Sequence, residues 1–211
     1  MNQAAVERLV ERVRGGASSS EVIAALDGWT LEPAEKALER LASYAVPLSR
    51  RLGKGELVTT VSAPEVRLDP RAWNGLWSVL VHVVRNALDH GIETPDVRAA
   101  HGKGQPRLRF SAREEGGRLF VEIADDGQGI DWKRVAEKAA ARGMPAATQK
   151  DLEAALLDPG FTTRDEITTI SGRGVGMSAV AEEVKRLGGT MEVMTTPQLG
   201  TAWQFSLPMA A

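Results

Sequence analysis

The sequence predicts an α/β (α+β) fold: a two-layer sandwich in which helices cover one face of a mixed β-sheet, preceded by a short helical segment. Most strand-like segments come in pairs separated by turn residues, as in antiparallel hairpins. Each helix-like segment has a single apolar stripe, which suits packing against one face of a sheet. The expected division is a helical segment of residues 1–47 and a sandwich of residues 48–211.

Helical spacing dominates the chain up to about residue 55. From Val6 to Val13, apolar residues recur three or four positions apart. The segment "GGASSSE" (residues 15–21) interrupts the chain and caps a second helix, and residues 30–52 predict a third. Pro47 is expected to kink or end this third helix, because proline lacks a backbone N–H.

The strands and helices of the sandwich follow from residue 56 onward. Alternation of apolar and polar residues predicts the strands, and helical apolar spacing predicts the helices. The predicted strands are residues 56–62, 107–112, 118–124, 190–196 and 201–208; the predicted helices are residues 73–91, two between residues 131 and 158, and one that ends at Leu187 before Gly188 and Gly189.

Composition excludes several classes of function. The 211 residues have a formal net charge of −2 with both signs mixed along the chain, which disfavours binding to nucleic acid or to an anionic membrane. There is no cysteine, so disulfides and thiolate metal sites are excluded. No segment reaches the roughly 18 apolar residues of a membrane span. We therefore expect a cytoplasmic protein without membrane insertion.

Polar residues lie inside the apolar helix at "VVRNALDHGI" (residues 83–92). His82, Asn86 and His90 step by four and so predict one row along the helix. Arg85 and Asp89 form a second pair with the same spacing. An ordinary exposed helix face has the same appearance, so this pattern alone leaves both interpretations open.

The segment "IADDGQGI" (residues 123–130) follows a predicted strand. Asp125 offers a carboxylate that can accept a hydrogen bond from an exocyclic amine. Gly127 and Gly129 allow a ligand to approach the backbone closely. A plain turn is the alternative, because Asp-Gly is a common turn dipeptide.

The segment "SGRGVGM" (residues 171–177) leads into a predicted helix. Backbone N–H groups at a glycine-rich helix start suit phosphate oxygens. The spacing Gly-x-Gly-x-Gly differs from the dinucleotide fingerprint Gly-x-Gly-x-x-Gly, and no Gly-Lys-Ser or Gly-Lys-Thr occurs. The Rossmann and P-loop interpretations are therefore rejected.

Together these segments resemble a known family. The order "LVHVVRNALDHGIETPDVRAAHGKG", "VEIADDGQGID", "PGFTTRDEITTISGRGVGMSAV", "LGGTMEV" and "LGTAWQFSLP" is similar to the ATP-binding catalytic domain of CheA-family chemotaxis histidine kinases. The matching segments correspond to the N, G1, F and G2 boxes of that family, within residues 48–208. The resemblance implies the Bergerat (GHKL, HATPase) fold, also found in gyrase, Hsp90 and MutL-type ATPases, which agrees with the two-layer sandwich.

The resemblance implies a role for each polar residue of the first two boxes. Asn86 would bind Mg²⁺, which prefers oxygen ligands. Asp125 would accept from the N6 amine of adenine, and Gly127 and Gly129 would lie against the purine. The implied nucleotide-binding set also includes Asp89 and Ile130.

The resemblance assigns the phosphate end to three further segments. Lys138, with Arg134, would face the phosphates, although a solvated helix side explains both residues nearly as well. Phe161 would be the F-box aromatic residue; a core phenylalanine is the alternative. The segment covering the phosphates would contain Gly172, Arg173, Gly174, Val175, Gly176 and Met177.

The two N-box histidines are the remaining candidates for catalysis. At the position of His82, other proteins with this fold have a glutamate that activates water, whereas CheA-like kinases have histidine. An imidazole there can still orient a group or accept a proton near neutral pH. His90 is expected to position Asn86 or a phosphate, and His101 is assigned no role.

The implied reaction is transfer of the γ-phosphoryl group of Mg·ATP to a histidine of a phosphotransfer domain, with a response regulator downstream and receptor or CheW-like coupling proteins as possible partners. With three histidines, two of them in the N box, the sequence offers no acceptor of its own. The acceptor is therefore expected in trans or in another part of the protein. The alternatives are a regulatory module that binds ATP without transfer and a GHL-type ATPase, which His82 disfavours.

Overall fold

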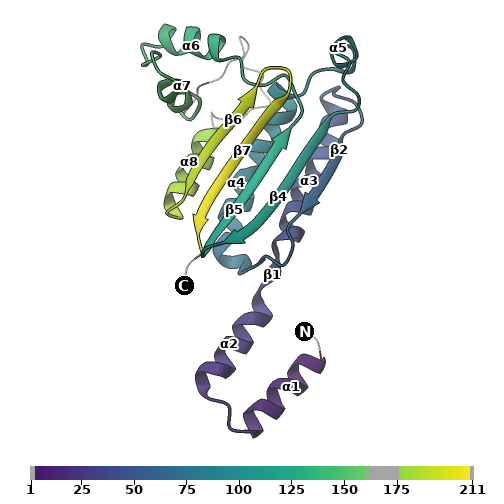
Figure 1. Cartoon of the computed structure of the whole chain (residues 1–211), viewed down its shortest axis with the longest axis vertical. Coiled ribbons are helices and arrows are strands. Elements are labelled where there is room, and N and C mark those ends of the chain that lie inside the picture. Colours follow the sequence, from purple (N-terminus) through teal and green to yellow (C-terminus); the bar gives the residue numbers. More distant parts are fainter. Residues whose placement is uncertain (1–2, 160, 162–175, 210–211) are drawn as a thin grey trace.

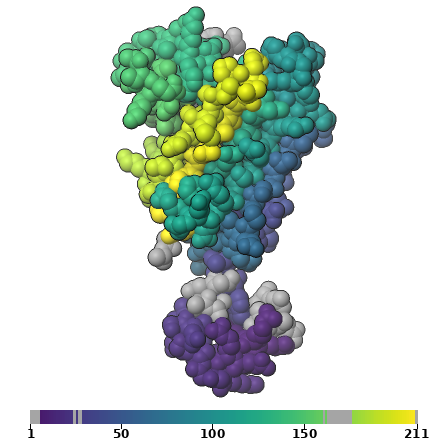
Figure 2. Space-filling view, in the orientation of Figure 1, coloured from purple at the N-terminus to yellow at the C-terminus, as the bar shows by residue number. Residues whose placement is uncertain are grey.

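The computed structural model describes residues 3–159, 161 and 176–209. Figure 1 shows one sandwich and, apart from it, a lobe made of α1 (Gln3–Arg14) and α2 (Ser19–Thr30). The same lobe stands clear of the sandwich in Figure 2. Ser18 caps α2 by accepting from the Glu21 backbone N–H, and the Glu21 side chain accepts from the Ser18 N–H in return. The serine-rich segment therefore starts a helix, as the sequence predicts.

Five strands form the main sheet in the order β2-β4-β5-β7-β6. They are β2 (Val58–Ser62), β4 (Arg107–Glu115), β5 (Arg118–Asp125), β6 (Thr190–Thr196) and β7 (Gly200–Pro208). β2 pairs with β4 in parallel and all other pairs are antiparallel, so the sheet is mixed. Both predicted hairpins are present. A short second sheet pairs β1 (Glu32–Pro33) with β3 (Arg67–Leu68).

Three helices lie behind the sheet in Figure 1: α3 (Ala34–Arg51), α4 (Pro70–Asn86) and α8 (Met177–Arg186). Alternate residues of the strands point toward these helices. Phe110, Ile123 and Phe205 are almost fully buried there. Leu80 and Val180 come from the helices to meet them in the same core. This arrangement confirms the predicted two-layer sandwich.

α3 is part of the sandwich core. Leu38, Leu41 and Ala45 are buried against the elements that follow in the chain. The division expected between residues 47 and 48 therefore lies inside a helix that belongs to the sandwich. Of the two outcomes expected at Pro47, a kink or an end of this helix, the end is wrong, because α3 continues to Arg51. Pro47 is exposed, while burial of the next residues, Leu48 and Ser49, holds the final turn in place.

α4 has clear start and end signals. Asp69 caps its start by accepting from the Arg71 backbone N–H at 2.9 Å, and Pro70 occupies the first turn, where no N–H is needed. Its end widens into a π-helical turn, η1 (Ala87–Gly91), closed by a 2.7 Å bond from the Ile92 N–H to the Ala87 carbonyl. Each residue of a π-turn rotates the chain by less than in an α-helix. The α-helical spacing behind the predicted row therefore holds from His82 to Asn86, and His90 follows within the π-helical turn.

Three further helices complete the described part of the chain: α5 (Pro95–Ala100), α6 (Trp132–Ala141) and α7 (Gln149–Leu156). α5 follows η1 at the end of the sheet where β5 stops, and α6 packs on α7 beside the β6 end of the sheet (Figure 1). Among the described residues, no helix is long and apolar enough to cross a membrane.

Candidate functional site

Asp125 is the last residue of β5, and η1 contacts this end of the sheet. The backbone N–H of Gly127 donates to Asp125 Oδ1 at 2.9 Å. The surrounding protein atoms desolvate the carboxyl group and raise its pKa to about 6, although the N–H groups of Gly127 and Thr201 oppose this rise. The site therefore contains a carboxyl group that changes its charge not far below neutral pH.

Gly127 and Gly129 both have packing reasons to be glycine. A Cβ on Gly127 would collide with the Gly91 backbone carbonyl. Gly129 has a φ of 81°, and a Cβ there would lie 2.7 Å from the Thr196 carbonyl oxygen. The sequence suggested these glycines for close approach of a ligand; the structure adds close approach of the protein's own backbone.

Hydrogen bonds tie the loop of residues 126–131 to two distant segments. Gln128 donates from its backbone N–H to the Gly91 carbonyl at 2.9 Å and from its side chain to the His90 carbonyl at 2.7 Å. The N–H of Ile130 donates to Thr195 Oγ1 on β6 at 2.9 Å. The end of the polar helix and the last hairpin therefore hold this loop from two sides.

The side chains of His82 and Asn86 are half-buried on α4. Neither has a hydrogen-bond partner among the residues that the structure describes. Burial lowers the pKa of His82, and the positive charge of Arg85 lowers it further, so the imidazole is mainly neutral at pH 7. Ile92 follows η1, and its carbonyl accepts a hydrogen bond from the Lys54 ammonium group at 2.7 Å. This bond holds the end of η1.

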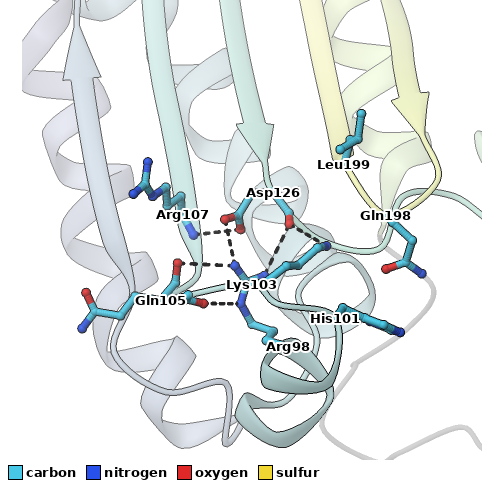
Figure 3. A pocket seen from close by; sticks show the side chains of 9 residues that line it. Arg98, His101, Lys103, Gln105, Arg107, Asp126, Gln198 and Leu199 are labelled. Carbon is cyan, nitrogen blue, oxygen red and sulfur yellow. Dashed lines mark hydrogen bonds and ion pairs between the residues drawn. The ribbon is translucent and has the colours of Figure 1, made fainter.

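An ion network built on the buried side chains of Glu93 and Arg98 contacts the 126–131 loop, and Figure 3 shows its members Arg98, Lys103 and Asp126. We call its four members, Glu93, Arg98, Lys103 and Asp126, the Glu93 network. Arg98 bonds Glu93 at 3.0 Å and Asp126 at 2.8 Å, and Lys103 bonds Glu93 at 2.7 Å. Burial alone would raise the pKa of Glu93, but the hydrogen bond from Lys103 and the two positive charges lower it below its ordinary value. The four charges sum to zero.

Two open hollows lie beside these elements. One, of about 660 Å³, is lined by Arg98, His101, Lys103, Arg107, Asp126 and Leu199 among others, and Figure 3 shows these side chains. The other, of about 570 Å³, lies on α6 and is lined by Asp131, Lys133, Arg134, Glu137 and Lys138. The described cations of α6 therefore share their surroundings with two carboxylates.

Comparison with known proteins identifies the fold family. A family model described as histidine kinase-, DNA gyrase B-, and HSP90-like ATPase matches residues 75–211. The chain belongs to this family. The match begins within α4 and includes η1, Asp125 and the loop of residues 126–131.

Relatives with curated descriptions are chemotaxis proteins CheA. The chain is 38% identical to the protein of Treponema pallidum over 182 residues, covering 84% of this chain and 22% of the relative. Identity is 35% for Halobacterium salinarum, covering 85% of this chain and 28% of the relative, and 33% for Bacillus subtilis, covering 84% and 27%. The chain thus spans about a quarter of the length of these relatives.

Solved histidine kinases share the fold. The nucleotide-free catalytic domain of histidine kinase ThkA superimposes with a TM-score of 0.56 at 14% identity, covering 85% of this chain and 95% of the domain. Full-length ShkA, solved in complex with AMPPNP, gives a TM-score of 0.54 at 19% identity, covering 86% of this chain and 32% of that protein. At such identities the likeness concerns the fold alone.

The ATPase-family fold brings together most of the described residues that the sequence selected. Asp125, Gly127, Gly129, Ile130 and the His90 carbonyl meet at one end of the sheet. Asp89 lies in η1, and His82 and Asn86 precede it on α4. Lys138 is on α6, which packs mainly on α7.

The predicted phosphate-covering segment is described only at its end. Gly172, Arg173, Gly174 and Val175 lie outside the described residues. Gly176 precedes α8 and Met177 is its first residue, with a side chain buried in the core. The Phe161 ring lies 5.6 Å from the Arg142 guanidinium carbon, measured to the ring centroid.

Sequence reasoning missed the Glu93 network. Glu93 and Lys103 stand in the quoted N-box segment, but no hydrophobic period marks "HGIETPDVRAAHGKG" (residues 90–104) as buried. Among the described residues, Arg98 and Glu93 are the only charged side chains that are almost fully buried. The available signal was a set of charges of both signs, Glu93, Arg98 and Lys103, within 11 residues that also contain glycine and proline.

Proposed function

We propose that this chain is the ATP-binding catalytic domain of a CheA-like histidine kinase. It would bind Mg·ATP and support transfer of the γ-phosphoryl group to a histidine of a phosphotransfer domain. The observation that carries the proposal is the Asp125 carboxylate, oriented by backbone N–H groups at the end of the sheet in a family whose members include histidine kinases. The CheA relatives favour a kinase over a non-catalytic module.

Adenine recognition falls to Asp125 in this proposal. An ionised carboxylate accepts two or more hydrogen bonds, and a bond to a charged acceptor is stronger than a neutral one. One oxygen already accepts from Gly127, which leaves acceptor capacity for the N6 amine. Selection of adenine over a base with a carbonyl at that position follows from the same geometry, because a carbonyl offers no donor.

The described residues fit a magnesium ion held mainly by phosphates. No cluster of three acidic, histidine or cysteine side chains that could bind a metal occurs in the described part of the chain. Asn86 offers one half-buried amide oxygen without a protein partner there. Mg²⁺ is commonly bound by one or two protein oxygens together with phosphate oxygens and waters. Bound at Asn86, the ion would neutralise charge on the phosphates.

Phosphoryl transfer depends mostly on position and charge stabilisation. The neutral imidazole of His82, one helical turn before Asn86, could orient the acceptor imidazole or take up its proton. A response regulator and a CheW-like coupling protein would complete the pathway. The phosphorylated histidine belongs to the partner domain in this scheme.

The test is incubation of the purified chain with γ-labelled ATP, Mg²⁺ and isolated phosphotransfer domains of CheA relatives. We expect acid-labile label on the partner domain and none with its acceptor histidine replaced. Tight ATP binding without transfer to any such domain would contradict kinase activity and leave a nucleotide-binding module. Absence of ATP binding would contradict the whole proposal.

A further inference from the structure

We propose that Lys103 and Arg98 are positioning residues for base recognition, acting on Asp125 through a single peptide plane. This inference rests on the proposed role of Asp125 as the adenine acceptor. Arg98 lies on α5 and Lys103 in the following loop. In the proposed mode of binding, neither side chain contacts the Asp125 carboxylate or the base. The structure connects them to the site by hydrogen bonds through the backbone of residues 126 and 127.

Lys103 directs its ammonium group at the backbone of the 126–131 loop. Nζ donates to the Gly127 carbonyl at 2.7 Å, to the Asp126 carbonyl at 3.0 Å and to Glu93 Oε1 at 2.7 Å. An ammonium has three N–H groups, so these three acceptors use its full capacity. Two of the three are loop carbonyls, which a simple ion pair with Glu93 would not require.

Arg98 approaches the same backbone from α5. Its side chain is 2% exposed and makes five hydrogen bonds, the number of N–H groups on a guanidinium. One bond reaches the Asp126 carbonyl at 3.3 Å, and another reaches Asp126 Oδ2 at 2.8 Å. The Asp126 carbonyl oxygen therefore faces two cations, and the Asp126 side chain is fixed as well.

The peptide unit between Asp126 and Gly127 carries this constraint to the site. Its carbonyl oxygen accepts from Lys103 and Arg98, while its N–H donates to Asp125 Oδ1 at 2.9 Å. Peptide units are planar, so fixing the oxygen also fixes the direction of the N–H. Cations at the oxygen polarise the unit and strengthen the hydrogen bond at its other end. The two side chains thus set the orientation of the carboxylate that would read the base.

Ligand discrimination tests this inference better than affinity alone. The variant Lys103→Met keeps most of the side-chain length but removes the three donors; Lys103→Arg keeps a cation, and Lys36→Met on the exposed face of α3 is the matched control. Affinities for ATP, ITP and tripolyphosphate would be measured by calorimetry. ITP replaces the N6 amine with a carbonyl, and tripolyphosphate lacks the base.

We expect Lys103→Met to lower the ATP-to-ITP preference about 10-fold and to leave tripolyphosphate affinity within about 2-fold, the size expected for loss of a charged hydrogen-bond partner. Lys103→Arg should recover part of the preference. The pH midpoint of ATP binding should move upward in Lys103→Met, because a less polarised N–H stabilises the carboxylate less. A purely structural role would lower all three affinities together.

Folding could fail in Lys103→Met, since Glu93 would lose a partner in a buried place. The double variant Glu93→Gln, Lys103→Met removes one charge of each sign and so keeps the network neutral. Its thermal unfolding should be closer to the natural protein, yet its base preference should stay low. Retained ATP-to-ITP preference in either folded variant overturns the inference alone. Absence of that preference in the natural protein overturns the proposed adenine recognition and the inference with it.

Discussion

At the end of β5, the Asp125 carboxylate and the carbonyls behind it are bonded to protein groups, whereas on α4 the side chains of His82 and Asn86 have no partner among the described residues. The first region is pre-organised: its geometry is fixed by a buried ion network and by close glycine packing. The second offers polar atoms that a ligand can use at no cost in protein hydrogen bonds. In our proposal the first region selects the base and the second holds the metal and phosphates.

The largest expected effect on binding comes from the second region. Asn86→Ala should abolish the Mg²⁺-dependent part of ATP affinity, a loss of about 100-fold or more, because it removes the proposed protein ligand of the ion. The melting temperature should hardly change, since the side chain has no hydrogen-bond partner in the described part of the chain. Calorimetric titration of ATP with Mg²⁺ and with a chelator measures the difference. Equal affinities for variant and natural protein in Mg²⁺ would remove Asn86 from the metal site.

In the first region, replacement of the proposed adenine acceptor, Asp125, should change ATP affinity and folding stability in opposite directions. Asp125→Asn should weaken ATP about 10-fold and leave tripolyphosphate unchanged, because an amide accepts more weakly than a carboxylate. The folded state raises the pKa of Asp125 from 3.8 to about 6, so the ionised group destabilises the fold above that range. At pH 7 the neutral asparagine should therefore stabilise the free protein, by about 3 kcal/mol at most.

The sign of this stability difference follows from the raised pKa. Between about pH 4 and 6 the folded state binds a proton that the unfolded state has lost, so stability falls as pH rises through this window. The advantage of Asp125→Asn should be greatest at pH 7 and nearly absent at pH 4, as measured by urea unfolding. The natural protein should also bind ATP more tightly as pH rises through 6, relative to tripolyphosphate. If the stability advantage of Asp125→Asn did not vary with pH, it would not arise from ionisation of the Asp125 carboxyl group.

The two regions were not equally predictable from the sequence. The sheet, its hairpins and the positions of Asp125 and Asn86 follow from local patterns, because alternation and helical spacing depend on near neighbours. The Glu93 network could not be found in this way: Arg98 and Lys103 look like exposed charges in the sequence, and they donate to backbone carbonyls more than 20 residues away. The widened turn η1 was missed for a similar reason, since its backbone bond from Ile92 to Ala87 follows no side-chain pattern. Pro47 shows packing of the next turn outweighing a local helix-ending signal.

The smallest effect is expected at α6. The described surroundings of Lys138 include Asp131 and Glu137, which reduce the field of a nearby cation, and α6 packs mainly on α7. Lys138→Ala should therefore weaken ATP by no more than about 3-fold, as for a largely screened charge. Lys133→Ala, in the same hollow but more exposed, is the matched control. A 10-fold loss of both ATP and tripolyphosphate affinity in Lys138→Ala, but not in Lys133→Ala, would contradict this expectation. It would place Lys138 with Asn86 in the phosphate-binding region, which would then include α6.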